Sequence, residues 1–286
     1  MKFVKRFFEV GKRAAKIMGE PYYQGFPAQM AFYMLLSIVP MVIVLSQVLG
    51  LFDISVRYLY YIVDRYVSED ISSVIDSLFN YKPTGVNNII LTVTAAWAAS
   101  KVMVPMHRLS NYTYTDGEYT RRGLIKEKIK SIIMVMIMVA TLVFTLVVLV
   151  YGKLIMNVTI GALSDNRVVD ILWTYLRWPL NILLYFMIVS INYYFMPSKK
   201  MKFSEIFPGS IFCSLGMMLA TIGFSIYVSQ IANYDIIYGS LASIVAVMFW
   251  LFIMAQILCL GVIFNKAWAD TKAGSMDPLV DREPVR

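Results

Sequence analysis

Long apolar segments, separated by short polar ones, dominate this chain of 286 residues. A helix needs about 20 mostly apolar residues to cross the roughly 30 Å hydrocarbon core of a bilayer. Six runs reach or approach that length, and we expect them to be membrane-spanning helices: residues 27–52, 86–106, 131–152, 171–196, 207–231 and 239–265. The pattern predicts an all-α, polytopic membrane protein.

The distribution of positive charge decides the orientation of these runs and whether the short second run spans. With six spans and both termini inside, the inner segments hold 19 Lys and Arg residues and the outer segments hold five. Lys and Arg strongly prefer the cytoplasmic side of short loops. If the second run did not span, the asymmetry would be much weaker. We therefore expect six spans in a cytoplasmic membrane, with both termini in the cytoplasm.

Residues 1–26 form a basic, amphipathic segment before the first span. Phe3, Phe7, Ala14 and Met18 recur at helical spacing, and Lys and Arg residues crowd the remaining positions. This pairing is typical of a helix that lies on the anionic inner leaflet; a solvated basic tail is the alternative. The segment lacks the apolar core of a signal peptide.

The first outer segment, residues 53–85, is longer than a turn. Apolar residues recur at helical spacing on either side of Ser68, which resembles an N-cap followed by an acidic first turn. We expect two short amphipathic helices over the outer end of the bundle. Residues 266–286 hold few apolar side chains and are expected to form a disordered cytoplasmic tail, so that the transmembrane domain comprises residues 27–265.

Small residues form a stripe along the fifth span, at positions 209, 213, 216, 220 and 223. Such stripes let a neighbouring backbone approach closely, which is how helices associate within a membrane. The start of the sixth span, with Gly239, Ala242, Ser243 and Ala246, offers a partner surface. The predicted helix-packing residues are Gly209, Gly216, Gly223 and, in the first span, Pro40.

One face of the first span carries Tyr33, Ser37, Pro40, Val44 and Gln47. Pro40 has no amide hydrogen, and its ring crowds the carbonyl of Leu36. Ser37 can help to satisfy the freed backbone. This face is expected to turn toward protein or an internal cavity rather than lipid; a packing kink and a substrate passage both explain it.

Polar residues also follow the fourth span, where Arg177, Asn181, Tyr185 and Asn192 recur at helical spacing. An arginine within a span normally faces the bundle interior, pairs with another group, or snorkels to an interface. Because a guanidinium offers paired donors to phosphate, one hypothesis is that Arg177 binds an anionic head group. Tyr33, Ser37 and Gln47 would continue this path, and Lys101 would receive the group near the inner side. The alternative is that both cations snorkel.

The composition agrees with a membrane protein and gives no support to catalysis. The chain is 59% hydrophobic and 15% charged, with a formal charge of +8 that cationic cytoplasmic edges explain without nucleic acid. His107 is the only histidine, and Cys213 and Cys259 both lie in apolar runs. No catalytic or metal-binding motif lies within the spans. We expect no enzymatic activity, no metal and no cofactor.

Four segments together resemble the YihY/BrkB family of bacterial inner-membrane proteins: AFYMLLSIVP, LSNYTYTDGEYTRRG, IFPGSIFCS and YGSLASIVAVMFWLFIMAQILCLGVIFNKAW. The resemblance covers roughly residues 20–270. Its matching positions are Asn111, Tyr114, Pro208, Gly209, Tyr238, Gly239, Ser240, Leu241, Trp250, Gly261 and Asn265. The sequence departs from the family pattern at Phe32, where a tyrosine or small residue is usual, and in its shorter tail.

The resemblance implies six helices in a bacterial cytoplasmic membrane, and it carries the historical label ribonuclease BN. A single histidine cannot supply the ligands of a metal-dependent phosphodiesterase, and His107, beside Arg108, lacks an acid–base partner. Two classes remain: a transporter that moves or shelters a lipid or lipid-linked envelope precursor, and a non-transporting structural or assembly protein of the envelope. The expected partners are membrane lipids, including the anionic inner leaflet, and not nucleic acid.

The topology gives a direct test. Cysteines introduced at Ser72 and Ser164 should react with a membrane-impermeant thiol reagent added outside intact cells, because both positions lie in predicted outer segments. A cysteine introduced at Ser198 should stay unlabelled. External labelling of the Ser198→Cys variant would contradict the six-span topology.

Overall fold

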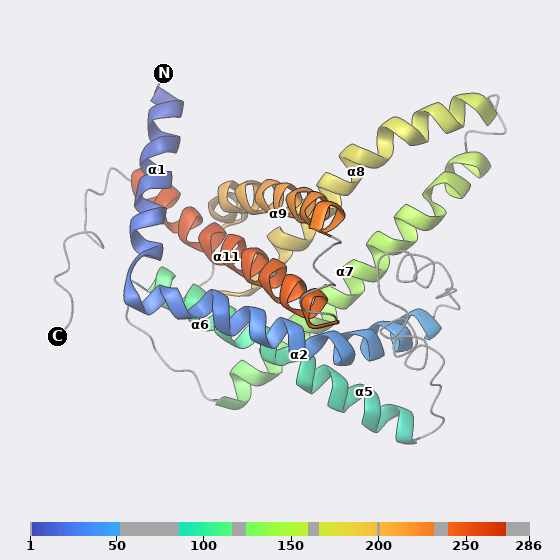
Figure 1. Cartoon of the computed structure of the whole chain (residues 1–286), viewed down its shortest axis with the longest axis horizontal. Helices are drawn as coiled ribbons and strands as arrows, with labels where there is room; N and C mark the ends of the chain where they lie inside the picture. Colours follow the sequence, from blue (N-terminus) through green and yellow to red (C-terminus); the bar gives the residue numbers. More distant parts are fainter. Residues whose placement is uncertain are drawn as a thin grey trace. The chain divides into compact units, whose positions relative to one another are not determined.

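The computed structural model describes residues 2–51, 86–115, 124–159, 166–198, 201–231 and 240–272. Within these residues the regular elements are all helical (Figure 1). They are α1 (Lys2–Met18), α2 (Pro21–Leu51), α5 (Val86–Ala99), η1 (Ser100–Val102), α6 (Met103–Tyr114), α7 (Leu124–Thr159), α8 (Asn166–Phe195), α9 (Phe203–Ile231) and α11 (Ser240–Lys272). The predicted all-α fold class is confirmed.

Five segments of the described helices are long and apolar enough to cross a membrane: Pro21–Gln47, Ile89–Tyr114, Lys128–Thr145, Phe203–Tyr227 and Val245–Thr271. The fourth predicted span, residues 171–196, lies in α8, where a shorter apolar segment covers Ile182–Phe195. The count of six therefore stays a prediction. The helices predicted on either side of Ser68 lie outside the described residues.

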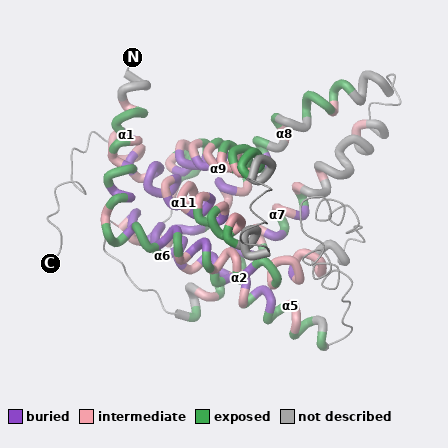
Figure 2. Tube along the Cα trace, viewed as in Figure 1, coloured by how far each residue is buried: buried purple, intermediate pink, exposed green. Residues whose placement is uncertain are grey.

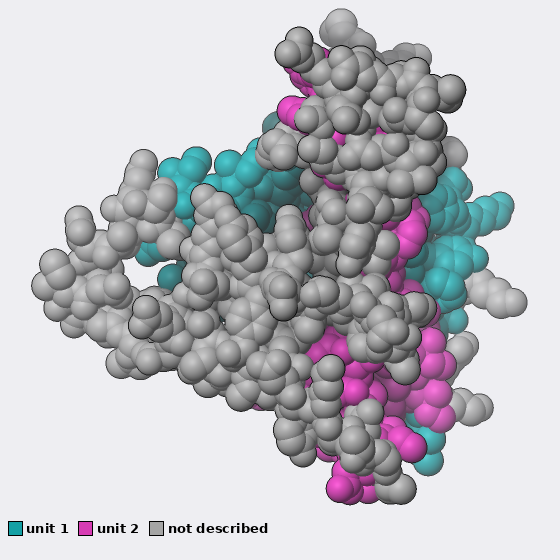
Figure 3. Space-filling model, turned by 90° about the vertical axis from the view of Figure 1, so that its right-hand side faces the viewer, with its two compact units in different colours: residues 1–35, 102–127, 189–286 teal, residues 36–101, 128–188 magenta. Residues whose placement is uncertain are grey.

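The chain divides into two compact units (Figure 3). Unit 1 contains residues 1–35, 102–127 and 189–286, and unit 2 contains residues 36–101 and 128–188. Unit 1 therefore combines both ends of the chain with a segment from its middle.

Helix α11 is the core element of unit 1, because α1, α6 and α9 all pack against it (Figure 1). Its C-terminal half is buried on nearly every side, including Cys259, Val262, Ile263 and Phe264 (Figure 2). A helix that is apolar all round is typical of such a central position. Residues predicted to begin a disordered tail at 266 instead continue this helix to Lys272; residues 273–286 lie outside the described part.

The side of α9 that does not pack on α11 faces away from the rest of unit 1. Its exposed residues Ile211, Leu215, Leu219, Ile222 and Ile226 recur at helical spacing. A continuous stripe of exposed aliphatic side chains would be unfavourable in water and suits contact with lipid tails. This stripe lies on the other face from the small residues, so α9 has one lipid-type face and one packing face.

The start of α2 is joined to α6 by aromatic side chains within unit 1. The rings of Tyr22 and Tyr112 stack with centroids 3.7 Å apart. The buried Tyr23 hydroxyl accepts a hydrogen bond from Thr113 Oγ1 at 3.4 Å. Helix α2 itself continues without interruption through Pro40 to Leu51, and the predicted kink there stays a prediction.

Candidate functional site

The second predicted span, residues 86–106, is broken near its C-terminal end. Helix α5 ends at Ala99, the 3₁₀ turn η1 covers Ser100–Val102, and α6 begins at Met103. Pro105 explains the break, because it has no amide hydrogen for the carbonyl of Lys101 and its ring crowds that carbonyl. A 3₁₀ segment within a longer helix often marks a functional hinge or local strain.

Lys128, at the start of the apolar part of α7, reaches into this break. Its Nζ atom donates to the carbonyl of Trp97 at 2.9 Å and to Ser100 Oγ at 2.6 Å. The same ammonium lies 4.5 Å from the centroid of the Trp97 ring, a cation–π distance. Ser100 Oγ also donates to the Trp97 carbonyl at 2.7 Å. These contacts fix the ammonium in one place within unit 2.

A second cation, Lys101, lies in η1 itself, and its residue is exposed. Lys101 directly follows Ser100, which binds the Lys128 ammonium, so the two positive charges lie in the same region of unit 2. Among the described residues, neither ammonium forms an ion pair with a carboxylate. An ammonium has three donors, and Lys128 spends two of them on Trp97 and Ser100. The arrangement can therefore bind an anion by hydrogen bonding and by relieving charge repulsion.

The residues predicted to form a polar path occupy three helices. Arg177 and Asn181 lie in α8, but their side chains are outside the described part of the structure. Tyr185, also in α8, is exposed, and Asn192 near its end is half-buried. In α2, Ser37 is buried, and Tyr33 and Gln47 are half-buried. The path that would join these residues stays a prediction, whereas Lys101 is the member that the structure places beside a second cation.

Several of the motif residues meet in the core of unit 1. The amide of Gly209 donates to Asn265 Oδ1 at 2.6 Å, and both residues are buried. The Tyr114 hydroxyl donates to the carbonyl of Val262 at 3.4 Å. Asn111 Oδ1 accepts from the amide of Ser198 at 2.7 Å and so joins α6 to the chain after α8. These contacts use the motif side chains for packing.

Glycine at 209 and 261 allows the backbones to approach. A Cβ atom at Gly209 would lie 2.5 Å from Asn265 Cγ and would also meet the Gly261 carbonyl oxygen. A Cβ atom at Gly261 would meet the hydroxyl of Tyr193, which donates to the carbonyl of Leu258 at 2.8 Å. Gly209 therefore lies where the backbones of α9 and α11 approach closely.

The other two glycines of the small-residue stripe, Gly216 and Gly223, differ in how closely their neighbours pack. A Cβ atom at Gly216 would lie 3.0 Å from Ile257 Cγ2, a tight contact. At Gly223 it would meet nothing within 4 Å, so the packing role predicted there is not seen among the described residues. Next to this position, the rings of Phe224 and Trp250 stack with centroids 5.7 Å apart.

Gly209 and Gly216 do not face the predicted partner surface at the start of the last helix. Gly209 faces Gly261 and Asn265, and Gly216 faces Ile257, whereas the prediction used the start of the sixth span. Helices α9 and α11 run antiparallel, so the start of one lies beside the end of the other. The side chains of Ala242 and Ser243 are outside the described part of the structure.

His107 has a structural partner that the sequence did not reveal. It is buried, and its Nδ1 atom lies 2.8 Å from the carbonyl oxygen of Met196. Since a carbonyl can only accept, Nδ1 carries the hydrogen. Among the described residues, no group of three or more His, Cys, Asp or Glu side chains could hold a metal ion.

Outside the spans, burial raises the pKa of the Glu20 carboxyl, and the nearby Lys16 ammonium opposes that shift.

Comparisons with known proteins agree on one family. The family model described as "Virulence factor BrkB" matches residues 18–282. The ribonuclease-like protein YfkH of Bacillus subtilis is 26% identical over 237 residues, covering 82% of this chain and 86% of that protein. A UPF0761 membrane protein of Vibrio atlanticus is 25% identical over 266 residues, covering 85% of this chain and 79% of its own length. No solved structure matches the chain.

The glycine contacts predict a graded response to alanine along α9. Gly209→Ala should destabilise the protein by about 1–3 kcal/mol, because the added methyl meets backbone and a buried amide. Gly216→Ala should cost less, because the flexible end of Ile257 can shift. Gly223→Ala should change stability by no more than about 1 kcal/mol. Thermal unfolding of the purified variants in detergent measures this order, and equal melting temperatures for the 209 and 223 variants would refute the contact.

Proposed function

Because the chain belongs to the BrkB family of integral membrane proteins, we propose that it binds an anionic amphiphile and moves it between leaflets. The substrate class is a lipid or a lipid-linked envelope precursor. The protein acts in the bacterial cytoplasmic membrane with both termini in the cytoplasm, as the charge distribution indicates. It binds membrane lipids rather than nucleic acid, and it is not an enzyme.

The observation that supports this proposal is the broken second span with its two cations. Discontinuous helices mark binding sites in many transporters. Lys128 is held in the break by Trp97 and Ser100, and Lys101 lies in the break itself. A cationic break suits an anionic head group.

The position of Lys128 along α7 indicates how deep in the membrane this site lies. The apolar part of α7 begins at Lys128, and Lys128 contacts Ser100 directly. The break therefore lies at the end of α7 that the charge distribution assigns to the cytoplasm. This agrees with the expectation that Lys101 receives a head group near the inner leaflet, with Arg177 toward the outer leaflet.

Two neighbouring ammonium groups at a membrane boundary are unfavourable unless an anion lies near both. Charges in the hydrocarbon region are costly and normally mark pathways or pairs. A phosphate oxygen can accept from the remaining donor of Lys128 and from Lys101 at the same time, which offsets the repulsion. Trp97 adds an aromatic face of the kind found at the head-group level.

A structural or assembly role is the second candidate, and a different observation favours it. Gly209, Tyr114, Asn111 and Asn265 spend their polar groups on contacts within unit 1. A family whose motif residues mainly hold helices together could serve as a scaffold in the envelope. This role requires no lipid movement.

Lipid exchange in vesicles distinguishes the two candidates. The full chain is reconstituted with fluorescent phosphatidylglycerol or phosphatidylcholine, and a membrane-impermeant quencher reports how fast outer-leaflet lipid is replaced. Lys128→Gln and Lys101→Gln should each slow exchange of the anionic lipid about tenfold, the effect of losing one charge-assisted hydrogen bond. Lys202→Gln changes an exposed lysine just before the start of α9; it is the matched control and should behave like the parent.

Each outcome of that experiment decides between the candidates. Slower exchange in both variants, with the control unchanged and all proteins equally folded, supports transport through this site. Parental exchange rates in Lys101→Gln and Lys128→Gln would remove the cationic break from the mechanism. Exchange no faster than in protein-free vesicles would favour the structural role.

Arg177 gives an independent test of the outer end of the path. If it binds a head group, Arg177→Lys should retain partial exchange, whereas Arg177→Gln and Arg177→Leu should lose it with normal folding, because lysine keeps the charge but not the bidentate donors. Parental lipid binding and exchange in all three variants would make Arg177 an interface anchor.

A further inference from the structure

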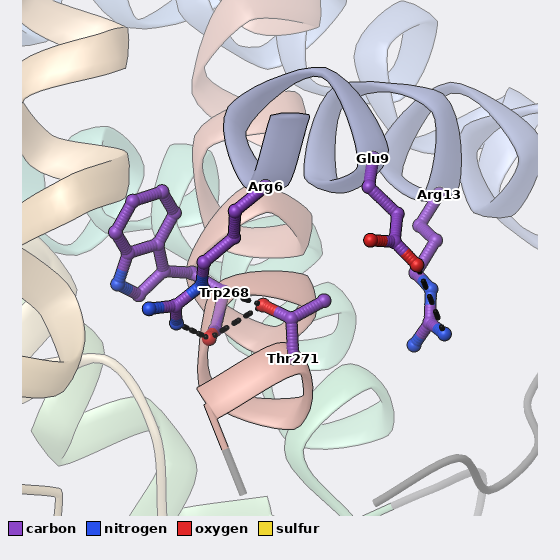
Figure 4. A network of polar contacts seen from close by, with 5 residues as sticks. All are labelled: Arg6, Glu9, Arg13, Trp268 and Thr271. Carbon is purple, nitrogen blue, oxygen red and sulfur yellow. Dashed lines mark hydrogen bonds and ion pairs between the residues drawn. The ribbon is translucent and has the colours of Figure 1, made fainter. Parts of the chain in front are cut away.

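The N-terminal helix α1 is fixed to the end of α11 by Arg6 (Figure 4). Its Nη2 atom donates to the carbonyl of Trp268 at 2.8 Å, and its Nε atom donates to Thr271 Oγ1 at 3.3 Å. The guanidinium carbon lies 4.2 Å from the centroid of the Trp268 ring. Carbonyls in the last turns of a helix carry partial negative charge, so a guanidinium there is favourable.

Packing on α11 uses one face of α1. Val10, Ala14, Ile17 and Met18 are buried, at the spacing of a single helical stripe. The ring of Phe7 lies beside Phe264, with centroids 5.6 Å apart. Of the apolar stripe predicted to lie on the membrane, Ala14 and Met18 are therefore occupied by protein contacts, whereas Phe7 is 47% exposed and the side chain of Phe3 is not described.

A second apolar strip remains on the surface of α1. Phe8 is 77% exposed, Ala15 is exposed, and a Cβ atom at Gly11 would meet nothing within 4 Å. Positions 8, 11 and 15 share one side of a helix. Exposed Lys12 and Lys16 border this strip. The combination of an exposed aromatic ring with neighbouring lysines is typical of helices at a membrane interface.

The direction of α1 is also consistent with a helix at the membrane interface. In Figures 1 and 4, α1 crosses the C-terminal end of α11 rather than running along it. Both α2 and α11 contain segments long and apolar enough to span a membrane. A helix that crosses the ends of spanning helices lies in the plane of the interface. The charge distribution assigns this end of the bundle to the cytoplasm, whose leaflet is anionic.

We infer that the strip formed by Phe8, Gly11 and Ala15 inserts among the head groups of an anionic leaflet, with Lys12 and Lys16 on the lipid phosphates. The inference concerns α1 alone and does not depend on lipid transport. Its geometry differs from that of a free amphipathic helix, because the larger apolar face is held by α11 through Arg6. The fold therefore sets the place of α1 at the end of α11, and Lys12 and Lys16 supply the attraction that draws the exposed strip among anionic head groups.

Spin labels on the full chain in vesicles test this inference. Labels are attached at Phe8→Cys and, as a comparison at the polar edge of the exposed side, at Glu9→Cys. The parent protein, whose Cys213 and Cys259 are buried, is the control for background labelling. In vesicles that contain phosphatidylglycerol, the label at position 8 should be relaxed mainly by oxygen. The label at position 9 should be relaxed mainly by a water-soluble nickel complex.

The role of the lysines is tested in the same samples. Combining Phe8→Cys with Lys12→Gln and Lys16→Gln should abolish the preference of the label for oxygen in anionic vesicles, as should high salt in place of those substitutions. Equal access of the nickel complex at positions 8 and 9 would overturn the inference, because the strip would then face water. Exclusion of both reagents from position 8 would also overturn it, because a second copy or another protein would then cover the strip.

Discussion

The close approach of α9 to α11 at Gly209 is the constraint on which unit 1 depends. Helices in a bilayer gain little from the hydrophobic effect, because lipid tails are as apolar as their side chains. Tight contact and polar bonds must supply the association instead. Gly209 provides both, since its missing side chain admits the Gly261 backbone and its amide donates to Asn265.

Backbone carbonyls of α11 accept hydrogen bonds from side chains of the neighbouring helices, one after another along the helix. Tyr193, near the end of α8, donates to Leu258, and Tyr114 of α6 donates to Val262, one helical turn further. A carbonyl oxygen has a second lone pair, so it can accept such a bond while it remains in the helix. Arg6 of α1 continues the series at Trp268. One helix thus offers successive carbonyls to different partners.

The sequence predicted the elements well and their pairing less well. Hydropathy and charge located the apolar helices, because span length and loop charge are properties of each segment alone. The packing of Gly209 was also visible in the spacing of small residues. Its partner was not, because the antiparallel course of α9 and α11 brings Gly261, rather than the start of the last span, next to it.

The cationic break illustrates the same limit. Lys101 was identified because a charge inside an apolar run is visible in the sequence, but Lys128 was counted only as a cytoplasmic charge. Its contacts with Trp97 and Ser100 depend on how α5 and α7 meet. Pro105 was the available signal, since a proline four residues after Lys101 frees a carbonyl within the span.

The position of α11 in the core has a consequence for how the protein is made. Chains are synthesised from the N-terminus, yet α11, against which α1, α6 and α9 pack, follows all three of these helices in the sequence. Until then, Arg6 has no helix end to bind and Gly209 has no backbone to approach. Unit 1 can therefore assemble only once α11 has been synthesised, and a chain that stops before residue 240 lacks the element that its earlier helices share.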